Sequence, residues 1–400
     1  MTSDSSTAHR VLIAGGGVAG LEALLALRQL AGDRVALTLL APERQFTYRP
    51  MAVGVPFGRG HMQRHDLADV ARATAAEFVR GELAEVDVPA RSAVLTDGRR
   101  IEYDALLVAV GAGAEPAFSR VRTWTPELDR EVFGGLLADL EEGYAKRIAF
   151  VVPRDVAWPL PAYELALMTA WDARDMGQDD VEVTVYTPEQ APLEIFGTEA
   201  SAGLLEDLEE AGVRVETGVV VEEDPDAPAR LLAGAGGPPL GTQRVIALPR
   251  AVARGVGGLV ADERGFIRTD EHGRAESAPG VWAAGDAIAF PIKQGGLAAQ
   301  QADAAAEAIA AEAGADIAPQ PFHPVLRGVL LTGRGRRWIR RDLEGSEEGE
   351  TQRHALWWPP TKIAGRYLAP YLAALDEAEF TDADRPTGRL VEFTVEGHGR

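Results

Sequence analysis

The sequence predicts an α/β protein with two three-layer domains, the second inserted into the first, and a small C-terminal module. Near the N-terminus, a glycine-rich turn separates an apolar run from a helical run. Further along, runs rich in β-branched residues alternate with helical segments over residues 148–221, which indicates a second parallel sheet. With 400 residues, the chain also exceeds what one hydrophobic core usually supports.

The first turn reads Gly-Gly-Gly-Val-Ala-Gly at residues 15–20 and fits the pattern G-x-G-x-x-G. Gly15 permits the tight turn, Gly17 lets backbone N–H groups approach a pyrophosphate, and Gly20 lets the helix pack closely on the strand. The N-terminus of the following helix adds partial positive charge. The sequence therefore predicts a Rossmann-like unit with an anion cradle.

A second segment reads Val-Trp-Ala-Ala-Gly-Asp-Ala at residues 281–287. The glycines alone do not choose between a nicotinamide and a flavin nucleotide. The second segment adds a contact suited to a ribityl chain, so the pair of motifs favours FAD. The run from Gly295 to Ala310 then consists of strong helix formers, and its N-terminal dipole would stabilise negative charge on a reduced flavin.

With these motifs the chain resembles the FAD-dependent pyridine nucleotide-disulfide oxidoreductase superfamily over nearly its whole length. In that superfamily the Asp of the second motif hydrogen-bonds the ribityl hydroxyls, and the matching residue is Asp286. The run that ends in Gly111 is similar to a segment that lies against FAD, with Val110 in place of a Thr. The acid that meets the adenosine ribose has no direct match: Ala41 stands at the strand end, and Glu43 is the nearest substitute.

Two further features complete the expected cofactor site. A mixed aromatic and basic loop spans residues 44–50, and Lys293 lies between the ribityl-binding Asp and the following helix, where its ammonium could stabilise reduced flavin. A solvent-facing lysine is the competing interpretation. The predicted cofactor-binding residues are Gly15, Gly17, Val18, Ala19, Gly20, Glu43, Arg49, Gly111, Gly285, Asp286, Lys293 and Gly296.

The resemblance implies a division of the chain. We expect a flexible N-terminus at residues 1–9 and a FAD-binding domain formed by residues 10–120 and 245–318. Residues 121–244 would form the inserted NAD(P)-like domain, and residues 319–400 a C-terminal module that covers the flavin or forms an interface.

The inserted domain lacks its own glycine fingerprint. The strand run at residues 148–152 is followed by Pro153 to Ala162, which contains no glycine and cannot offer the same close backbone approach. This loss most resembles the branch of sulfide:quinone oxidoreductases and flavocytochrome c sulfide dehydrogenase flavoproteins. Sulfide oxidation in that branch uses cysteines, and this chain has none, so we expect that chemistry to be absent.

Type II NADH dehydrogenases offer an alternative resemblance. They carry an Ala-Gln-x-Ala segment near a quinone site, which Ala299 to Ala302 matches, so Gln300 becomes a candidate for the acceptor pocket. An alanine-rich helix also produces such a tetrapeptide easily. That branch needs the glycines that are missing here, so any NAD(P)H would bind weakly through a rebuilt loop.

The candidate catalytic residues are Glu164, as proton carrier, and Lys293. A partly buried helix carboxylate explains Glu164 equally well. Trp357, Trp358 and Lys362 lie in a segment similar to the C-terminal element that covers the isoalloxazine in the sulfide:quinone branch, and aromatic walls would suit a quinone. Core or dimer packing explains the tryptophans as well.

Two clusters receive a structural interpretation. Five arginines surround Trp338, and we expect a solvated strand that pairs with Glu344, Glu347 and Glu348. His61 and His65 have helical spacing without a nearby acidic cluster, so no metal site is predicted.

Composition limits the partners. A net charge of −21, from 40 basic and 61 acidic residues, disfavours nucleic acid and anionic membranes. There is no membrane-spanning run and no leader-like N-terminus, so we expect a cytoplasmic protein. The apolar helical face of residues 367–372 leaves peripheral membrane contact open, and a homodimer also remains open.

The hypotheses are a flavoenzyme that passes two electrons from an unidentified donor to a quinone or other acceptor, an NAD(P)H-dependent variant, and a flavin-loaded binding protein.

Overall fold

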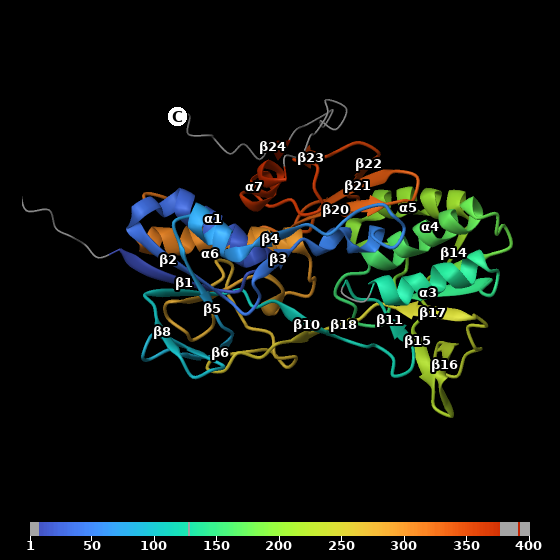
Figure 1. Ribbon diagram of the computed structural model, residues 1–400, viewed down its shortest axis with the longest axis horizontal. Coiled ribbons are helices and arrows are strands. Elements are labelled where there is room, and N and C mark those ends of the chain that lie inside the picture. Colours follow the sequence, from blue (N-terminus) through green and yellow to red (C-terminus); the bar gives the residue numbers. More distant parts are fainter. Residues whose placement is uncertain (1–7, 127–128, 377–390, 393–400) are drawn as a thin grey trace, which may run out of the picture.

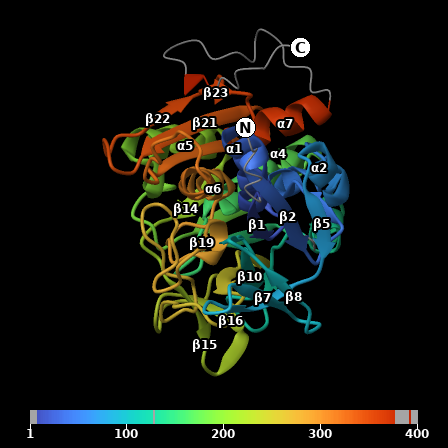
Figure 2. The ribbon, with the colours of Figure 1, turned by 90° about the vertical axis from the view of Figure 1, so that its left-hand side faces the viewer.

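The computed structural model describes residues 8–126, 129–376 and 391–392. Two α/β domains lie side by side, and a C-terminal module lies across both of them (Figure 1). The view in Figure 2 shows the same module above the first domain's helices. The predicted α/β fold with Rossmann-like domains is confirmed.

The first domain is built on a five-stranded parallel sheet with β1 at its centre. Successive side chains of β1 point to opposite faces. Val11 and Ile13 join a core with α1 and α6, and Leu12 and Ala14 join a core with a small antiparallel sheet. The elements are β1 (His9–Ala14), α1 (Val18–Ala31), η1 (Gly32–Arg34), β2 (Val35–Ala41), β3 (Gln45–Thr47), η2 (Arg49–Gly54), β4 (Arg64–Asp66), α2 (Leu67–Ala73), β5 (Glu77–Arg80), β6 (Leu83–Asp87), β7 (Ser92–Leu95), β8 (Arg100–Glu102), β9 (Ala105–Val108), β19 (Val281–Ala283), η4 (Gly285–Ala287) and α6 (Gly295–Glu312).

The second domain repeats this plan with the strand order β11-β17-β12-β13-β14. Ile148 and Phe150 face the helices α3, α4 and α5, and Val151 faces a β-hairpin on the other side. The elements are β11 (Arg122–Thr123), α3 (Asp129–Glu141), β12 (Arg147–Val151), α4 (Leu160–Asp175), β13 (Glu182–Tyr186), η3 (Glu194–Phe196), α5 (Thr198–Ala211), β14 (Val213–Glu216), β15 (Val221–Asp224), β16 (Ala227–Ala233) and β17 (Arg244–Ala247).

The chain passes between the two domains through β10 (Ala112–Glu115) and β18 (Arg250–Ala253), which pair antiparallel. The expected return to the first domain at residue 245 is therefore placed too early. β17 still pairs parallel with β12 in the second sheet, because its apolar residues complete that sheet's core. At the other end, His9 belongs to β1 and not to the expected flexible N-terminus, of which residues 1–7 lie outside the described residues.

The C-terminal module bridges the domains. Its sheet places Leu326, Leu330 and Ile339 in the second domain's core, whereas Ile363 and Leu368 join the first domain's core. The elements are β20 (Val325–Leu331), β21 (Arg336–Asp342), β22 (Glu350–Gln352), β23 (Trp357–Trp358), α7 (Leu368–Leu375) and β24 (Val391–Glu392).

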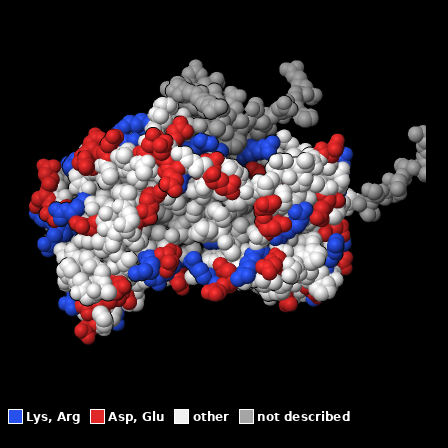
Figure 3. All heavy atoms as spheres, turned by 180° about the vertical axis from the view of Figure 1, so that it is seen from behind, with Lys and Arg blue, Asp and Glu red and all other residues white. Residues whose placement is uncertain are grey.

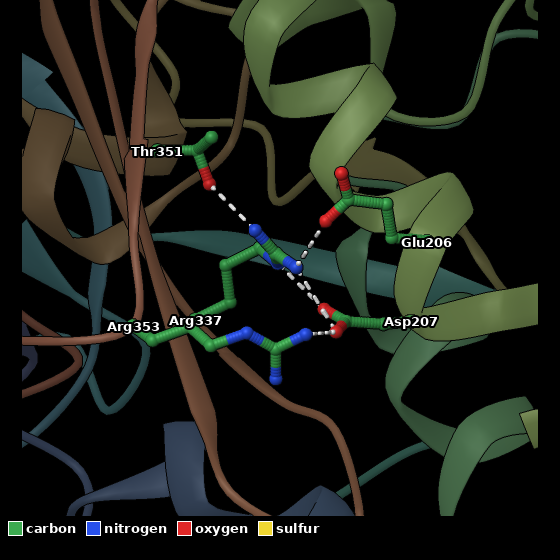
Figure 4. A network of polar contacts seen from close by, with 5 residues as sticks. All are labelled: Glu206, Asp207, Arg337, Thr351 and Arg353. Atoms are coloured by element: carbon green, nitrogen blue, oxygen red, sulfur yellow. Dashed lines mark hydrogen bonds and ion pairs between the residues drawn. The ribbon is translucent and has the colours of Figure 1, made fainter. Parts of the chain in front are cut away.

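A buried ionic network fastens this module to the second domain (Figure 4). Arg337 on β21 donates to both carboxylate oxygens of Asp207 on α5, at 2.5 and 3.0 Å, and Arg353 adds a third bond at 2.8 Å. Glu206 and Thr351 contact the same guanidinium at 3.5 Å. Two opposite charges without solvent around them hold one register of β21 on α5.

This network corrects the interpretation of the arginine cluster. The segment is a strand, as expected, but Arg337 points inward to Asp207 and is 4% exposed. The expected pairing with Glu344 is also wrong, because that carboxylate contacts His323 instead. The cause is the alternation of β21, which turns Arg337 toward α5 and leaves the preceding Arg336 exposed.

Candidate functional site

The glycine-rich turn after β1 forms a cradle that is closed on the protein side and open on the other. A Cβ on Gly15 would lie 2.0 Å from the carbonyl oxygen of Ala109, and one on Gly20 would lie 1.8 Å from the carbonyl oxygen of Gly15. A Cβ on Gly17 would meet no atom within 4 Å. Two of the glycines are thus required by packing, and Gly17 leaves backbone N–H groups open to a ligand.

The start of α1 is suited to an anion. Gly17 is the N-cap residue, no side chain caps the helix, and its first turn holds no acidic residue. Val18 and Ala19 are the first two residues of the helix, where backbone N–H groups point out of the helix end. The residues present therefore fit the pyrophosphate of a dinucleotide.

The second motif meets this cradle. Gly285 has φ of +76°, and a Cβ there would lie 3.0 Å from the Cβ of Ala19 and 3.5 Å from that of Ala298. Three chain segments thus converge: the start of α1, the Gly285–Asp286 turn and the start of α6. Gln301, 4% exposed, accepts the N–H of Gly285 at 2.9 Å and supports the turn from below.

Asp286, in the turn where these three segments meet, and Lys293 each shift the pKa of the other. Burial raises the pKa of Asp286, and the nearby ammonium of Lys293 opposes that rise. Burial lowers the pKa of Lys293 to about 8, and the Asp286 carboxylate opposes that shift. The ammonium lies 3.8 Å from the ring centre of Phe266 and donates to the carbonyl of Ile288. Lys293 is therefore not the solvent-facing lysine of the competing interpretation.

Glu164 and Lys362, which are 198 residues apart, form a buried ion pair. The ammonium lies 2.5 Å from a carboxylate oxygen of Glu164, and the same oxygen accepts the N–H of Leu331 at 2.8 Å. Burial raises the pKa of Glu164 and lowers that of Lys362, while the attraction between the two charges opposes both shifts. Burial thus brings the ion pair and the neutral pair closer in free energy, which is the condition for moving a proton.

The pair lies close to the cofactor cradle. Ile363, the residue after Lys362, packs against Gly295 at the start of α6, where a Cβ would lie 2.9 Å from its side chain. From the second domain, the carbonyl of Ala157 accepts the N–H of Lys293 at 3.2 Å. Segments from all three parts of the chain thus meet near the start of α6.

The other candidates for the acceptor pocket have structural partners. Gln300 exchanges two hydrogen bonds with the backbone of Val325, at 2.9 and 3.0 Å, and so holds β20 on α6. Trp357 is fully buried and donates to the carbonyl of Thr361 at 2.9 Å. Trp358, half-buried, is its neighbour on β23.

The remaining cofactor candidates lie at strand ends of the first domain. Glu43 is exposed two residues after β2, and Arg49 is exposed at the start of η2. Gly111 follows β9 with φ of +72° and open space where a Cβ would be, and Gly296 lies in the first turn of α6. The carboxyl ends of parallel strands meet at one edge of a sheet, so Glu43 after β2 and Gly111 after β9 lie at the same edge as the turn after β1.

In the second domain, side chains beside the turn without glycines are hydrogen-bonded to one another. The turn Pro153 to Ala162 leads into α4, where Pro159 is the N-cap residue. Tyr163 is fully buried and donates to Glu189 at 2.6 Å, and Thr187 donates to the same oxygen at 2.8 Å. Protein groups at the carboxyl end of β13 thus satisfy one another there.

A signal in the composition could have singled out the site lysines. Of the 40 basic residues only three are lysines, at positions 146, 293 and 362. Two of these three lie at the site, in a chain that uses arginine almost everywhere else. An ammonium loses its proton on burial far more readily than a guanidinium, so lysine at these positions carries chemical information. Gln301 gave no such signal, and neither did Tyr48, which is buried in the first domain.

A family model for pyridine nucleotide-disulphide oxidoreductases matches residues 9–125 and 164–308, more than half of the chain. The chain belongs to the pyridine nucleotide-disulphide oxidoreductase family. The match leaves out residues 126–163 and with them the turn Pro153 to Ala162. The predicted family and the prediction of a flavin-dependent oxidoreductase enzyme are confirmed.

Within this family, the chain is similar to a sulfide-quinone reductase of Aquifex aeolicus, at 27% identity over 215 residues. That match spans about half of each protein, 50% of this chain and 48% of the relative. The crystal structure of the Aquifex aeolicus sulfide:quinone oxidoreductase superposes with a TM-score of 0.76 at 20% identity, over 86% of this chain and 87% of that one.

Other structures share the fold at lower similarity. A ferredoxin reductase from Rhodopseudomonas palustris superposes with a TM-score of 0.61 at 21% identity, over 83% of this chain and 82% of that one. A NAD-dependent persulfide reductase from A. fulgidus gives 0.59 at 20% identity, over 83% and 64%. These likenesses show the fold alone.

Three features of the described residues concern possible partners: helix length and apolarity, metal-ligating side chains and surface charge. Among the described residues, no helix is both long and apolar enough to cross a membrane. The same part of the chain contains no group of three or more metal-ligating side chains. On the face in Figure 3, acidic and basic side chains are interspersed, with no single basic field.

Proposed function

We propose that this protein binds FAD and passes two electrons from a small donor to a quinone or another small acceptor. The observation that carries this proposal is the convergence of the Gly17 cradle, the Gly285–Asp286 turn and the start of α6. The cradle would hold the pyrophosphate and Asp286 the ribityl hydroxyls. When bound, FAD supplies the two-electron chemistry. The chain's own residues supply binding, charge and protons.

Lys293 and the start of α6 would provide positive charge next to the isoalloxazine. With a pKa of about 8, the Lys293 ammonium is mostly protonated at neutral pH and is held in place by the carbonyl of Ile288. A fixed cation and a helix N-terminus favour the negative charge that accompanies reduction.

Glu164 and Lys362 would supply and remove the protons that accompany two-electron transfer. The pair is buried among Leu331 and the C-terminal segment, and burial moves the pKa values of both groups toward each other. A proton that leaves Lys362 for a reduced acceptor is replaced through Glu164, and the reverse path serves a donor that loses protons.

The donor would react without a cysteine of this chain, since the sequence contains none. Attack of a thiolate on a sulfur substrate is therefore not part of the proposed reaction. NAD(P)H is the less favoured donor, because the turn Pro153 to Ala162 has no glycine and Tyr163 at the start of α4 is hydrogen-bonded to Glu189. The acceptor and the donor are proposed to be small molecules, with no role for nucleic acid.

An anaerobic donor screen tests the proposal. The purified protein, reconstituted with FAD where needed, is mixed with reduced quinones, sulfide, NADH and NADPH, and bleaching of the flavin absorbance is followed. We expect bleaching by reduced quinone, because electron exchange with the acceptor is reversible, and no rapid bleaching by NADH or NADPH. Protein that stays colourless after incubation with FAD contradicts the proposal, and rapid bleaching by NADH would favour the nicotinamide alternative.

A further inference from the structure

Tyr48 of the first domain makes a buried contact with the C-terminal segment that bears Lys362. The tyrosine is 6% exposed, and its hydroxyl oxygen accepts the N–H of Ile363 at 2.9 Å, across 315 residues of sequence. The backbone N–H of Lys362 and the side chain of Thr361 also lie near this oxygen, and they oppose the rise in the pKa of Tyr48 that burial causes. One phenolic oxygen is thus surrounded by three consecutive residues.

The turn at residues 361–363 is held from a second side. Trp357 donates its indole N–H to the carbonyl of Thr361 at 2.9 Å, and the hydroxyl of Thr361 donates to the carbonyl of Ile363 at 2.7 Å. Tyr48 therefore contacts a compact turn from the first domain, while Trp357 contacts it from the C-terminal module. The central residue of the turn is Lys362.

The direction of the lysine follows from this clamp. With its backbone fixed against Tyr48, the Lys362 side chain extends to Glu164 on α4 of the second domain, where it is 7% exposed. A lysine carries several rotatable bonds and loses much conformational freedom when it is held in one place. A fixed backbone at its base reduces the number of positions that the ammonium can reach.

We propose that Tyr48 is a positioning residue for the reaction: its hydroxyl oxygen fixes the 361–363 turn so that the Lys362 ammonium stays on Glu164. This inference rests on the proposed proton role of the Glu164 and Lys362 pair. It adds that the first domain, which carries the cofactor cradle, sets the geometry of a proton pair whose members belong to the other two parts of the chain.

Amine labelling tests the positioning directly. The FAD-loaded protein is treated with an N-hydroxysuccinimide ester, and peptides from cleavage at arginine are quantified by mass spectrometry. Lys362 should be protected in the native protein, and the exposed Lys146 serves as internal reference. In Tyr48→Phe, a buried N–H loses its acceptor, so we expect labelling of Lys362 relative to Lys146 to rise roughly tenfold or more.

The pH profile of turnover provides the second readout. The Lys362 ammonium lowers the pKa of Glu164, so a loosened ammonium in Tyr48→Phe should move the acid limb of the profile upward by about one pH unit. The matched control is Tyr103→Phe, because Tyr103 is fully buried in the first domain and its hydroxyl has no hydrogen-bond partner among the described residues. Thr361→Val loosens the same turn and replaces Tyr48→Phe if that variant does not fold.

The outcomes separate the two proposals. Increased labelling together with a shifted profile, both absent from Tyr103→Phe, supports the inference. Lys362 that stays protected in both Tyr48→Phe and Thr361→Val overturns it. Increased labelling with an unchanged profile supports the positioning of Lys362 by Tyr48 and overturns the proton role of the pair, which belongs to the proposed function.

Discussion

The helices α1 and α4 occupy equivalent places in the two domains, each after the strand that leads into its glycine or proline turn. Each carries a glutamate as its fifth residue, Glu22 in α1 and Glu164 in α4, and these are 0% and 1% exposed. Both carboxylates accept backbone N–H groups of the C-terminal module. Glu22 bonds Tyr367 and Leu368, at 2.7 and 2.8 Å, and Glu164 bonds Leu331. The module is thus anchored at the same helix position on both domains.

The two glutamates differ in their companion. Beside Glu22 lies Asp303 of α6, a second buried carboxyl group, and burial raises the pKa of both, that of Glu22 to about 7. Beside Glu164 lies the ammonium of Lys362. Two buried carboxyls hold one proton between them, whereas a carboxylate and an ammonium can exchange one with a reacting molecule. The two glutamates share a helix position, so their neighbours make the difference: Glu22 beside Asp303 is an anchor, and Glu164 beside Lys362 is a candidate for catalysis.

The largest effect is expected from Glu164→Gln. This change leaves the Lys362 ammonium buried without its counter-charge, which should cost about 3–5 kcal/mol of unfolding free energy. Turnover should fall by about 100-fold or more, because the proton carrier is gone. Urea unfolding and steady-state turnover of the FAD-loaded protein measure the two effects.

A second variant separates stability from catalysis. Glu164→Gln combined with Lys362→Met removes both charges and should recover most of the lost stability without recovering turnover. Glu22→Gln is the control on the equivalent helix and should lower stability with no change in the pH profile of turnover. Full turnover in Glu164→Gln would make Glu164 an anchor like Glu22 and would remove the contrast between the helices.

The starts of the two helices provide the next test. In Gly20→Ala the new Cβ would lie 1.8 Å from a backbone oxygen, so we expect a loss of about 3 kcal/mol. In Gly17→Ala the Cβ meets no protein atom within 4 Å, and the backbone there is extended, so stability should be unchanged. FAD retention, measured as flavin absorbance per protein, should fall in Gly17→Ala because the methyl group enters the cradle. Retention of FAD by Gly17→Ala at wild-type level would exclude this turn as its binding site.

Sequence reasoning reached the features that depend on neighbouring residues. The turn at residues 15–20 and the segment that ends in Asp286 are local patterns, because a tight turn and a close approach each require glycine at a fixed spacing. The apolar runs also predicted the strands: the strand run at residues 148–152 corresponds to β12, Arg147–Val151.

The contacts that assemble the site were beyond such reasoning. Tyr48 and Ile363 are 315 residues apart, and Glu22 and Tyr367 are 345 apart. No periodicity links positions at that separation, since their meeting depends on how the C-terminal module packs on both domains. Glu164 and Lys362 were each singled out as candidates, but nothing in the sequence paired them.

A smaller effect is expected from Asp303→Asn. Burial and the neighbouring Glu22 carboxyl raise the folded pKa of Asp303 well above its ordinary value, so the stability from this pair is present at low pH and is lost as the pH rises above that ordinary value. Asn keeps a donor for Glu22 and removes the second carboxyl. Unfolding free energy at pH 8 should therefore rise by about 2 kcal/mol, and its decline between pH 5 and pH 8 should flatten.

Arg366 and Glu307 face the same group and remain in this variant. Arg366→Gln is the opposite comparison: it removes a guanidinium that lowers the pKa of Asp303, so the decline of stability with pH should not flatten, and the lost ion pair with Glu307 should cost less than about 1 kcal/mol. An unchanged pH dependence in Asp303→Asn would show that Glu22 and Asp303 do not share a proton, and the contrast with Glu164 would then rest on Lys362 alone.

The smallest effect concerns the filled turn of the second domain. In Tyr163→Phe, Glu189 loses a donor at 2.6 Å and keeps Thr187, so we expect a loss of about 1 kcal/mol. Burial already raises the pKa of Glu189 to about 7, and the tyrosine opposes that rise. The loss should therefore be greater at pH 8, where Glu189 must be ionised, than at pH 5.

NADH should still fail to bleach the flavin of Tyr163→Phe, because removing one hydroxyl does not create the backbone donors of a glycine turn. If Tyr163→Phe gains rapid bleaching by NADH, the second turn is a blocked nucleotide site rather than a lost one, and the two helix starts differ by a single side chain.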